Sequence, residues 1–145
     1  MRRTLTLLAL AGLAAGTATA VPASAQAAVT AQAQDGYFYA WTGTNETGTR
    51  CRWYGNSSDW GTCRNEASSL WDNGYTDPGD PAYVRVFWGQ NWTGAYTCIR
   101  PGWYISDLRP RAFDDYSDSG TDTRGFGQTL NDNIASHSWI TDCEQ

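Results

Sequence analysis

The side chains of this sequence that could do chemistry are four cysteines, one histidine and fifteen acidic residues. Neither a Cys-x-x-Cys pair nor a Gly-x-Ser-x-Gly turn occurs, so the spacing supports neither a zinc site nor a serine nucleophile. His137 could act as a base with Asp132, but a lone histidine near a strand end is usually structural or solvent-facing. Among fifteen acidic side chains some pair always lies close, which gives paired-carboxylate hydrolysis no specific support. The sequence therefore predicts a protein that is not an enzyme.

The four cysteines, by contrast, predict disulfide bonds. Cys51, Cys63, Cys98 and Cys143 form an even set, which in an exported chain of this size indicates two disulfides. Three pairings are possible. We favour Cys51 with Cys63 and Cys98 with Cys143, because each bond then staples one half of the chain. Loop-closure entropy predicts that each bond adds about 3 to 4 kcal/mol to the free energy of unfolding.

The first residues have the pattern of an export signal. A basic start, an apolar run over residues 5–15 and an Ala-x-Ala site around Ala25 follow one another. The apolar run is shorter than the roughly 20 residues that span a membrane. We therefore expect a signal peptide over residues 1–27, a flexible leader over 28–35 and one secreted domain over 36–145.

The charge balance narrows the possible partners. All ten basic residues are arginine, which excludes Schiff-base and P-loop lysine chemistry. Ten arginines against fifteen acidic residues give the full chain a net charge of −5. Eight of the arginines and all fifteen acidic residues follow the predicted signal peptide, so the mature chain has a net charge of −7. Such an acidic chain is a poor partner for nucleic acid or for an anionic membrane. We expect no nucleic acid, no membrane insertion and a monomer.

An internal repeat organises the rest of the chain. Residues 37–48 (YFYAWTGTNETG) and 83–94 (YVRVFWGQNWTG) share Tyr, Gly, Asn, Thr and Gly at equivalent places when shifted by 46 residues. In both, an aromatic and β-branched run precedes a Gly-x-Asn-x-Thr-Gly turn and a second run, which predicts a β-hairpin twice. A later pair of segments, 65–71 and 132–139, is also alike.

These repeats predict the fold class. No sustained apolar stripe at helical spacing occurs, so strands must dominate. The second half is longer, and its extra residues fall within 108–129, which is rich in Asp and Gly and reads as an inserted acidic surface loop. Motif one, about 36–76, and motif two, about 82–143, fit an all-β sandwich of two Greek-key motifs stapled by disulfides.

Specific residues carry a resemblance to a known family. The run F-x-x-x-x-W-x-G at 87–94 matches the aromatic-x4-aromatic-x-Gly signature of the βγ-crystallin Greek key, and 41–48 keeps it except for Glu46. Segments 65–69 and 131–136 resemble the Asn/Asp-Asn/Asp-x-x-Ser/Thr-Ser element of that family. In order and duplication, the chain is similar to secreted bacterial βγ-crystallin-like peptidase inhibitors of the Streptomyces metalloproteinase-inhibitor type.

The resemblance raises the question of calcium, which prefers six to eight oxygen ligands. The corresponding positions here are Asn65, Ser68, Ser69, Asn131, Asp132 and Ser136. Each copy has lost one ligand position, because Arg64 is a cation and Ala135 has no hydroxyl. We therefore expect no tight calcium site and no other cofactor. The serines are instead expected to cap turns through hydrogen bonds to the backbone.

The resemblance also implies an inhibitory loop of Cys98, Ile99 and Arg100. Residues 97–100 resemble a Thr-Cys-Val-Arg stretch whose Cys-Val bond the family presents to the enzyme like a substrate. By position, the Cys98 carbonyl would meet a catalytic zinc and the Ile99 side chain would fill an apolar pocket. No cysteine follows Cys98 within a few residues, unlike in the family. An ordinary strand with Ile99 in the core therefore stays an equal alternative.

The resulting functional prediction is an extracellular inhibitor of secreted proteases, above all zinc metalloproteases, with segment 108–129 as a second contact surface. A glycan-binding or cell-wall-binding module is the main alternative, because exposed aromatic rings stack on sugars. A toxin-like secreted module is a third class. We expect Trp60 and Trp92 to be exposed, and we expect burial or half-burial for Trp41, Trp53, Trp71, Trp88 and Trp103.

Overall fold

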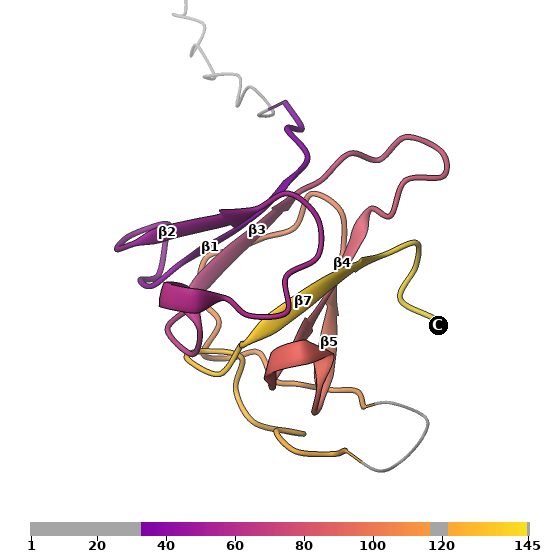
Figure 1. The fold of residues 1–145 in the computed structure, drawn as a ribbon. Coiled ribbons are helices and arrows are strands. Elements are labelled where there is room, and N and C mark those ends of the chain that lie inside the picture. Colours follow the sequence, from indigo (N-terminus) through magenta and orange to yellow (C-terminus); the bar gives the residue numbers. More distant parts are fainter. Residues whose placement is uncertain (1–32, 117–121, 145) are drawn as a thin grey trace, which may run out of the picture. The chain divides into compact units, whose positions relative to one another are not determined.

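A computed structural model of the chain describes residues 33–116 and 122–144 (Figure 1). The predicted signal peptide, 1–27, and most of the predicted leader, 28–35, lie outside the described residues. Within the described residues, seven strands and two 3-10 helices make up the regular structure. None of the helices in this part of the chain has the length and apolar character needed to cross a membrane.

The strands form two antiparallel sheets, as the alternating and β-branched runs predict. A four-stranded sheet has the order β2-β1-β3-β6, with β1 Tyr37–Trp41, β2 Arg50–Trp53, β3 Ser69–Asn73 and β6 Tyr104–Ile105. A three-stranded sheet has the order β5-β4-β7, with β4 Tyr83–Phe87, β5 Tyr96–Ile99 and β7 Ser136–Ile140. The 3-10 helices are η1, Gly61–Cys63, and η2, Gln90–Trp92. The predicted all-β class is confirmed.

Each half of the chain contributes to the sheet of the other half. β6 belongs to the second half but pairs with β3 of the first, with Leu70 opposite Ile105. In return, Ser57 of the first half pairs with His137 of β7, and the two residues exchange backbone hydrogen bonds of 3.0 and 2.9 Å. This exchange is what makes two Greek-key motifs one interlocked sandwich rather than two separate hairpins.

The same folded hairpin joins the first two strands of each half. Its backbone enters the left-handed region at matching positions, namely Asn45 (φ 53°), Glu46 (60°) and Gly48 (78°), then Asn91 (53°), Trp92 (58°) and Gly94 (79°). A glycine is needed at the third of these positions, since a Cβ on Gly94 would lie 2.9 Å from the Arg124 carbonyl oxygen. The Gly-x-Asn-x-Thr-Gly repeat therefore encodes this turn directly.

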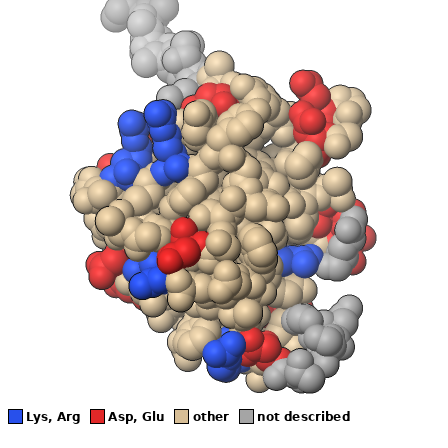
Figure 2. Space-filling view, in the orientation of Figure 1, with Lys and Arg blue, Asp and Glu red and all other residues tan. Residues whose placement is uncertain are grey.

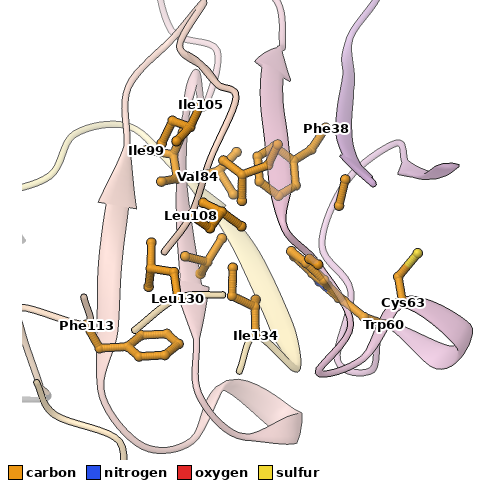
Figure 3. Packing of buried hydrophobic residues seen from close by; sticks show 14 of the residues in the cluster. Phe38, Trp60, Cys63, Val84, Ile99, Ile105, Leu108, Phe113, Leu130 and Ile134 are labelled. Atoms are coloured by element: carbon orange, nitrogen blue, oxygen red, sulfur yellow. The ribbon is translucent and has the colours of Figure 1, made fainter. Parts of the chain in front are cut away.

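The core lies between the two sheets (Figure 3). Phe38 of β1 lies near Val84 of β4, and the Trp60 ring lies between Ile134 and Cys63 of η1. Trp60, predicted to be exposed, is only 2% exposed and belongs to this core. The prediction was wrong because the segment around η1 crosses to the second half, where the Trp60 N–H donates to the Ala135 carbonyl at 2.9 Å.

Both disulfides pair as favoured from the sequence. Cys51 bonds to Cys63 and Cys98 bonds to Cys143, with Cα–Cα distances of 6.3 and 5.8 Å. The first bond ties β2 to η1. The second ties β5 to the chain after β7, across the central strand β4, so it fixes both outer strands of the three-stranded sheet.

Segment 108–129 packs more closely than its acidic composition suggests. Leu108 and Phe113 are fully buried in the core. Phe113 also joins its own backbone to that of residues 127–128. Its N–H donates to the Gln128 carbonyl at 3.0 Å, and its carbonyl accepts from the Gly127 N–H at 2.9 Å. The described part of this segment is therefore a structural wall of the domain as well as a surface.

Candidate functional site

A cavity of about 550 Å³ lies along the outer edge of β5. One wall is residues 97–100, and the opposite wall is residues 110–115. Ile105 of β6 and Leu130 close it toward the core. The three residues of the predicted inhibitory loop, Cys98, Ile99 and Arg100, all line this cavity. The structure thus brings them together, but on a concave surface next to a sheet edge.

The hydrogen-bond pattern of β5 sets which backbone groups face the cavity. Tyr96 exchanges backbone hydrogen bonds with Asp115, at 2.9 and 3.1 Å, on the side away from β4. Backbone groups alternate sides along a strand. The N–H and C=O groups of Thr97 and Ile99 therefore bond to β4, while the N–H and C=O groups of Cys98 point the same way as those of Tyr96. The Cys98 N–H and C=O therefore point out of the sheet toward the cavity.

The Ile99 side chain does not have the orientation that the inhibitor comparison implies. It is only 2% exposed and packs in the core opposite Val84 of β4. It cannot fill an enzyme pocket without leaving the core. This part of the expectation is corrected in favour of the ordinary-strand alternative, and the physical reason is that Ile99 lies on the inner face of its sheet.

A tryptophan between two arginines marks one end of the cavity. The guanidinium carbons of Arg100 and Arg111 lie 5.6 and 5.9 Å from the Trp103 ring centroid. Both are cation–π distances. Trp103 is 40% exposed, more than the predicted burial or half-burial. The cluster gives this end of the cavity a positive, aromatic surface, and Asp114 and Asp115 add negative charge further along the wall of residues 110–115.

Elsewhere, three arginines of the described residues form ion pairs with nearby carboxylates. In segment 108–129, Arg124 lies 2.7 Å from Asp122 and holds the pKa of that carboxyl well below its usual range. Arg109 similarly lowers the pKa of Asp107 through a 2.6 Å ion pair. Figure 2 shows acidic and basic groups scattered over the visible face with no broad patch of one sign. Long-range steering by this segment is correspondingly weak.

The first calcium-like segment does not suit a cation. Arg64 occupies the first ligand position, and its guanidinium binds Asp59 at 3.0 Å. The Gln90 side chain donates to the same carboxyl at 2.7 Å. The backbone N–H of Gly61, and then Gln90 and Arg64, lower the Asp59 pKa. The polar groups here already satisfy one another around a guanidinium charge, so the residues do not fit calcium.

The second segment offers few ligands. The Asn131 amide donates to Asp132 at 2.7 Å, its own oxygen is buried with no hydrogen-bond partner in the structure, and Ala135 is buried without a hydroxyl. One amide and one carboxylate supply fewer side-chain oxygens than the six to eight ligands that calcium prefers. In the described residues no group of three His, Cys, Asp or Glu side chains could hold a metal ion.

The two serines at the ends of these segments hold the hairpins. Ser69 Oγ donates to the Gly43 carbonyl at 2.7 Å, and Ser136 Oγ donates to the Gly89 carbonyl at 2.6 Å. Each also accepts a backbone N–H from the same hairpin, at 3.2 and 3.1 Å. Both serines are fully buried. Their turn-capping role, expected from the sequence, is confirmed.

His137 is a structural residue. Its side chain is fully buried, Nδ1 accepts from Trp60 Nε1 at 2.8 Å, and Nε2 lies 2.9 Å from the Gly55 carbonyl and donates to it. Burial lowers the pKa of His137 to about 4, so the ring is neutral at pH 7. Asp132 makes no contact with it that would support acid–base chemistry.

Sequence reasoning missed the second wall of the cavity. Arg111, Ala112 and Asp115 face β5 only because segment 111–115 pairs with 127–130 and then with Tyr96. The available signal was the apolar pair Ala112-Phe113 between charged residues. It is too short to distinguish a strand-like wall from a loop.

Comparison with known proteins supports the fold. No family profile and no curated protein sequence matches this chain. Solved structures of βγ-crystallin domains do match. One, from work on the evolution of the eye lens domain fold, is 17% identical with a TM-score of 0.51, over 73% of this chain and 85% of that one.

An archaeal βγ-crystallin is 15% identical with a TM-score of 0.48, over 72% of this chain and 96% of that one. A βγ-crystallin from Ciona intestinalis is 14% identical with a TM-score of 0.47, over 72% of this chain and 99% of that one. At these identities the likeness concerns the fold alone. The predicted βγ-crystallin-like fold is confirmed, and membership of the inhibitor group stays a prediction.

Proposed function

We propose that this protein is an extracellular, non-enzymatic inhibitor that engages a secreted protease through the outer edge of β5. The observation that carries the proposal is the direction of the Cys98 backbone N–H and C=O, which point out of the sheet into the cavity. An edge strand with outward backbone groups can pair with a strand of another protein. Proteases hold polypeptides in this extended form.

The Cys98–Cys143 disulfide supports this role. It anchors the contact strand to the chain after β7, and Tyr96 is held to Asp115 beside it. A strand already fixed in its bound shape loses little conformational entropy on association, which favours tight binding. The Cys98 carbonyl can still approach a catalytic zinc, but the side-chain contacts come from Arg100, Trp103 and Arg111 instead of the buried Ile99.

The test is a titration of residual activity of a thermolysin-type zinc protease with the mature protein. Ala112→Trp places a large ring in the cavity, and Ala112 is exposed, so no core contact is removed. We expect Ala112→Trp to weaken inhibition at least tenfold. The matched control is Thr49→Trp, at an exposed position beside β2, and we expect it to inhibit like the wild type.

Equal inhibition by both variants would place the contact away from β5 and refute this mode of binding. No inhibition of zinc, serine or cysteine proteases by the wild type would refute the inhibitor proposal itself. Ile99→Asp is unsuitable as a probe, because a charge at a core position is expected to unfold the domain.

Glycan binding is a second candidate, favoured by the outer face of the four-stranded sheet. Tyr39 stacks on Trp71 and on Trp41, with ring centroids 5.6 and 5.8 Å apart. Tyr104, 44% exposed, lies next to Trp71 in the register and extends this row of rings toward solvent. Calorimetry against soluble glycans, with pull-down on insoluble ones, tests it with Tyr104→Ala as the site variant. Uniform absence of binding would eliminate the candidate.

A further inference from the structure

We propose that a second, aromatic pocket of this protein binds a methylated ammonium group. The pocket has a volume of about 160 Å³, and the rings of Tyr54, Tyr75 and Trp139 line it together with Asp80 and Pro81. It shares no lining residue with the β5 cavity. Sites for drug-sized ligands span about 300 to 1,000 Å³, so this pocket admits only one compact group. The proposal does not rest on the inhibitor function.

The two tyrosine rings converge over Gly36, which lies against both of them in space. Tyr54 follows β2 and Tyr75 follows β3, and both ring edges lie over Gly36. A Cβ on Gly36 would lie 2.6 Å from Tyr75 Cε2 and 2.8 Å from Tyr54 Cε2. The φ of Gly36, 81°, also favours glycine. Tyr54 is further oriented by an edge contact with Tyr37, with centroids 5.5 Å apart.

Trp139 of β7 supplies the third ring, so the pocket joins residues of both sheets. Its six-membered ring packs directly on Gly74, where a Cβ would overlap it, and it makes an edge contact with Phe38 at 6.4 Å. Its backbone N–H is held by the Asn56 side chain at 2.7 Å. The ring position is therefore fixed before any ligand arrives.

A tight turn places the carboxylate. Asp77-Pro78-Gly79-Asp80 has proline and glycine at its two central positions, Gly79 has a φ of 98°, and the Asp80 N–H donates to the Asp77 carbonyl at 3.0 Å. This is the pattern of a type II turn. Asp80 is the only charged residue among those that line the pocket.

The charge and the rings select the ligand class. Electron-rich aromatic rings and a carboxylate both attract a cation, and the residues that line the pocket include no positive group to bind an anion. A primary ammonium is compact and strongly hydrated, so it loses much solvation in an aromatic site. Methyl groups spread the charge, reduce that loss and contact the rings directly, which is how aromatic cages recognise quaternary ammonium groups.

The experiment compares choline chloride with 3,3-dimethylbutan-1-ol, which has the same shape without the charge. Binding to the mature protein is followed by calorimetry and by the indole NMR signals. We expect saturable choline binding at least tenfold tighter than that of the neutral alcohol. Equal binding of both, or binding of neither, would overturn the proposal.

Variants locate the site. Asp80→Asn should weaken choline binding about threefold to tenfold, and Tyr75→Ala should abolish it, while Tyr75→Phe should retain it because the ring face is kept. The matched control is Asp77→Asn, an exposed carboxyl in the same turn that does not line the pocket. Equal losses in Asp77→Asn and Asp80→Asn would reduce the effect to general charge attraction and refute the pocket.

A trimethyl-lysine peptide and phosphocholine vesicles then distinguish a protein source of the methylated ammonium group from a lipid source.

Discussion

The two halves of the molecule build the same backbone from different side chains. Glu46 stands in the first hairpin where Trp92 stands in the second, yet their φ values are 60° and 58°. The glycine that follows and the buried serine that pins the hairpin are common to both. These two features, and not the aromatic ring, therefore set the turn. Trp92 adds a separate contact, since its indole donates to the His137 carbonyl at 2.8 Å.

The interior differs more than the hairpins. Leu70 in β3 and His137 in β7 each follow the pinning serine, and both are fully buried. Leu70 contributes only apolar packing, whereas His137 makes two hydrogen bonds. Two residues further, Asp72 occupies the place of Trp139. The comparison teaches that the other half supplies both hydrogen-bond partners of the buried His137 side chain, whereas the buried Asp72 side chain accepts from the nearby Gly74 N–H of its own half.

The largest effect is expected for His137→Leu, which gives the second half the residue of the first. Trp60 Nε1 and the Gly55 carbonyl would lose their partner, and each buried unsatisfied group costs about 1 to 3 kcal/mol. We expect the free energy of unfolding to fall by about 2 to 5 kcal/mol in guanidinium titrations at pH 7 with disulfides intact. Leu70→Met, which preserves volume, should cost less than about 1.5 kcal/mol. A fully stable His137→Leu would show that the two halves are interchangeable here.

Asp72 gives the next largest effect, and it depends on pH. Its side chain is fully buried, one carboxyl oxygen accepts from the Gly74 N–H at 3.0 Å, and the other has no hydrogen-bond partner in the structure. Burial raises the pKa of Asp72 to about 7. Between the unfolded value of about 3.9 and this one, the folded chain binds the extra proton, so stability falls as pH rises.

The pKa of His137, about 4, lies below its unfolded value of about 6.5, so its contribution has the opposite sign. Between pH 4 and 6.5 the unfolded chain binds the extra proton, and stability rises with pH. The opposite contributions of Asp72 and His137 to the pH dependence of stability should nearly cancel in the wild type over this range.

Asp72→Asn should therefore stabilise the protein at pH 8 by about 1 to 4 kcal/mol, at about 1.4 kcal/mol per pKa unit, with little change at pH 4. In this variant the free energy of unfolding should also rise by about 3 kcal/mol between pH 4 and 6.5, because the His137 contribution is no longer cancelled. Denaturation curves at four pH values measure this. A variant whose stability stays flat over that range would contradict the assignment.

The smallest effect concerns the feature that the halves share. Ser69→Ala and Ser136→Ala each remove a buried hydroxyl that donates to one hairpin carbonyl and accepts one N–H. We expect each to lower the free energy of unfolding by about 1 to 2 kcal/mol, and by similar amounts. Ser138→Ala, in the same strand as Ser136, is the control and should change it by less than about 0.5 kcal/mol. Clearly unequal losses at Ser69 and Ser136 would show that the hairpins are not held alike.

Features that short segments encode could be predicted from the sequence. The hairpins follow from Gly-x-Asn-x-Thr-Gly, because glycine and asparagine tolerate the left-handed backbone. The serine caps follow from the repeated segment before β3 and β7. Four cysteines in two halves favoured the disulfide pairing that the structure has. Residues 97–100, predicted as the contact loop, line the β5 cavity, and their role in binding stays a prediction.

What the sequence could not give is which way these residues point. Ile99 faces the core and Trp60 is buried under the second half, although both stand next to polar residues in the chain. Arg64 finds Asp59, and the wall of residues 110–115 meets β5, only after folding.

The sequence by itself therefore determined the strands and the turns, because those depend on backbone preferences of neighbouring residues, and it favoured the disulfide pairing without fixing it. The tertiary structure decided the cavity, the aromatic pocket and the hydrogen-bond partners of the buried His137. These depend on the exchange of β6 and the Ser57 segment between the halves, which no local pattern records.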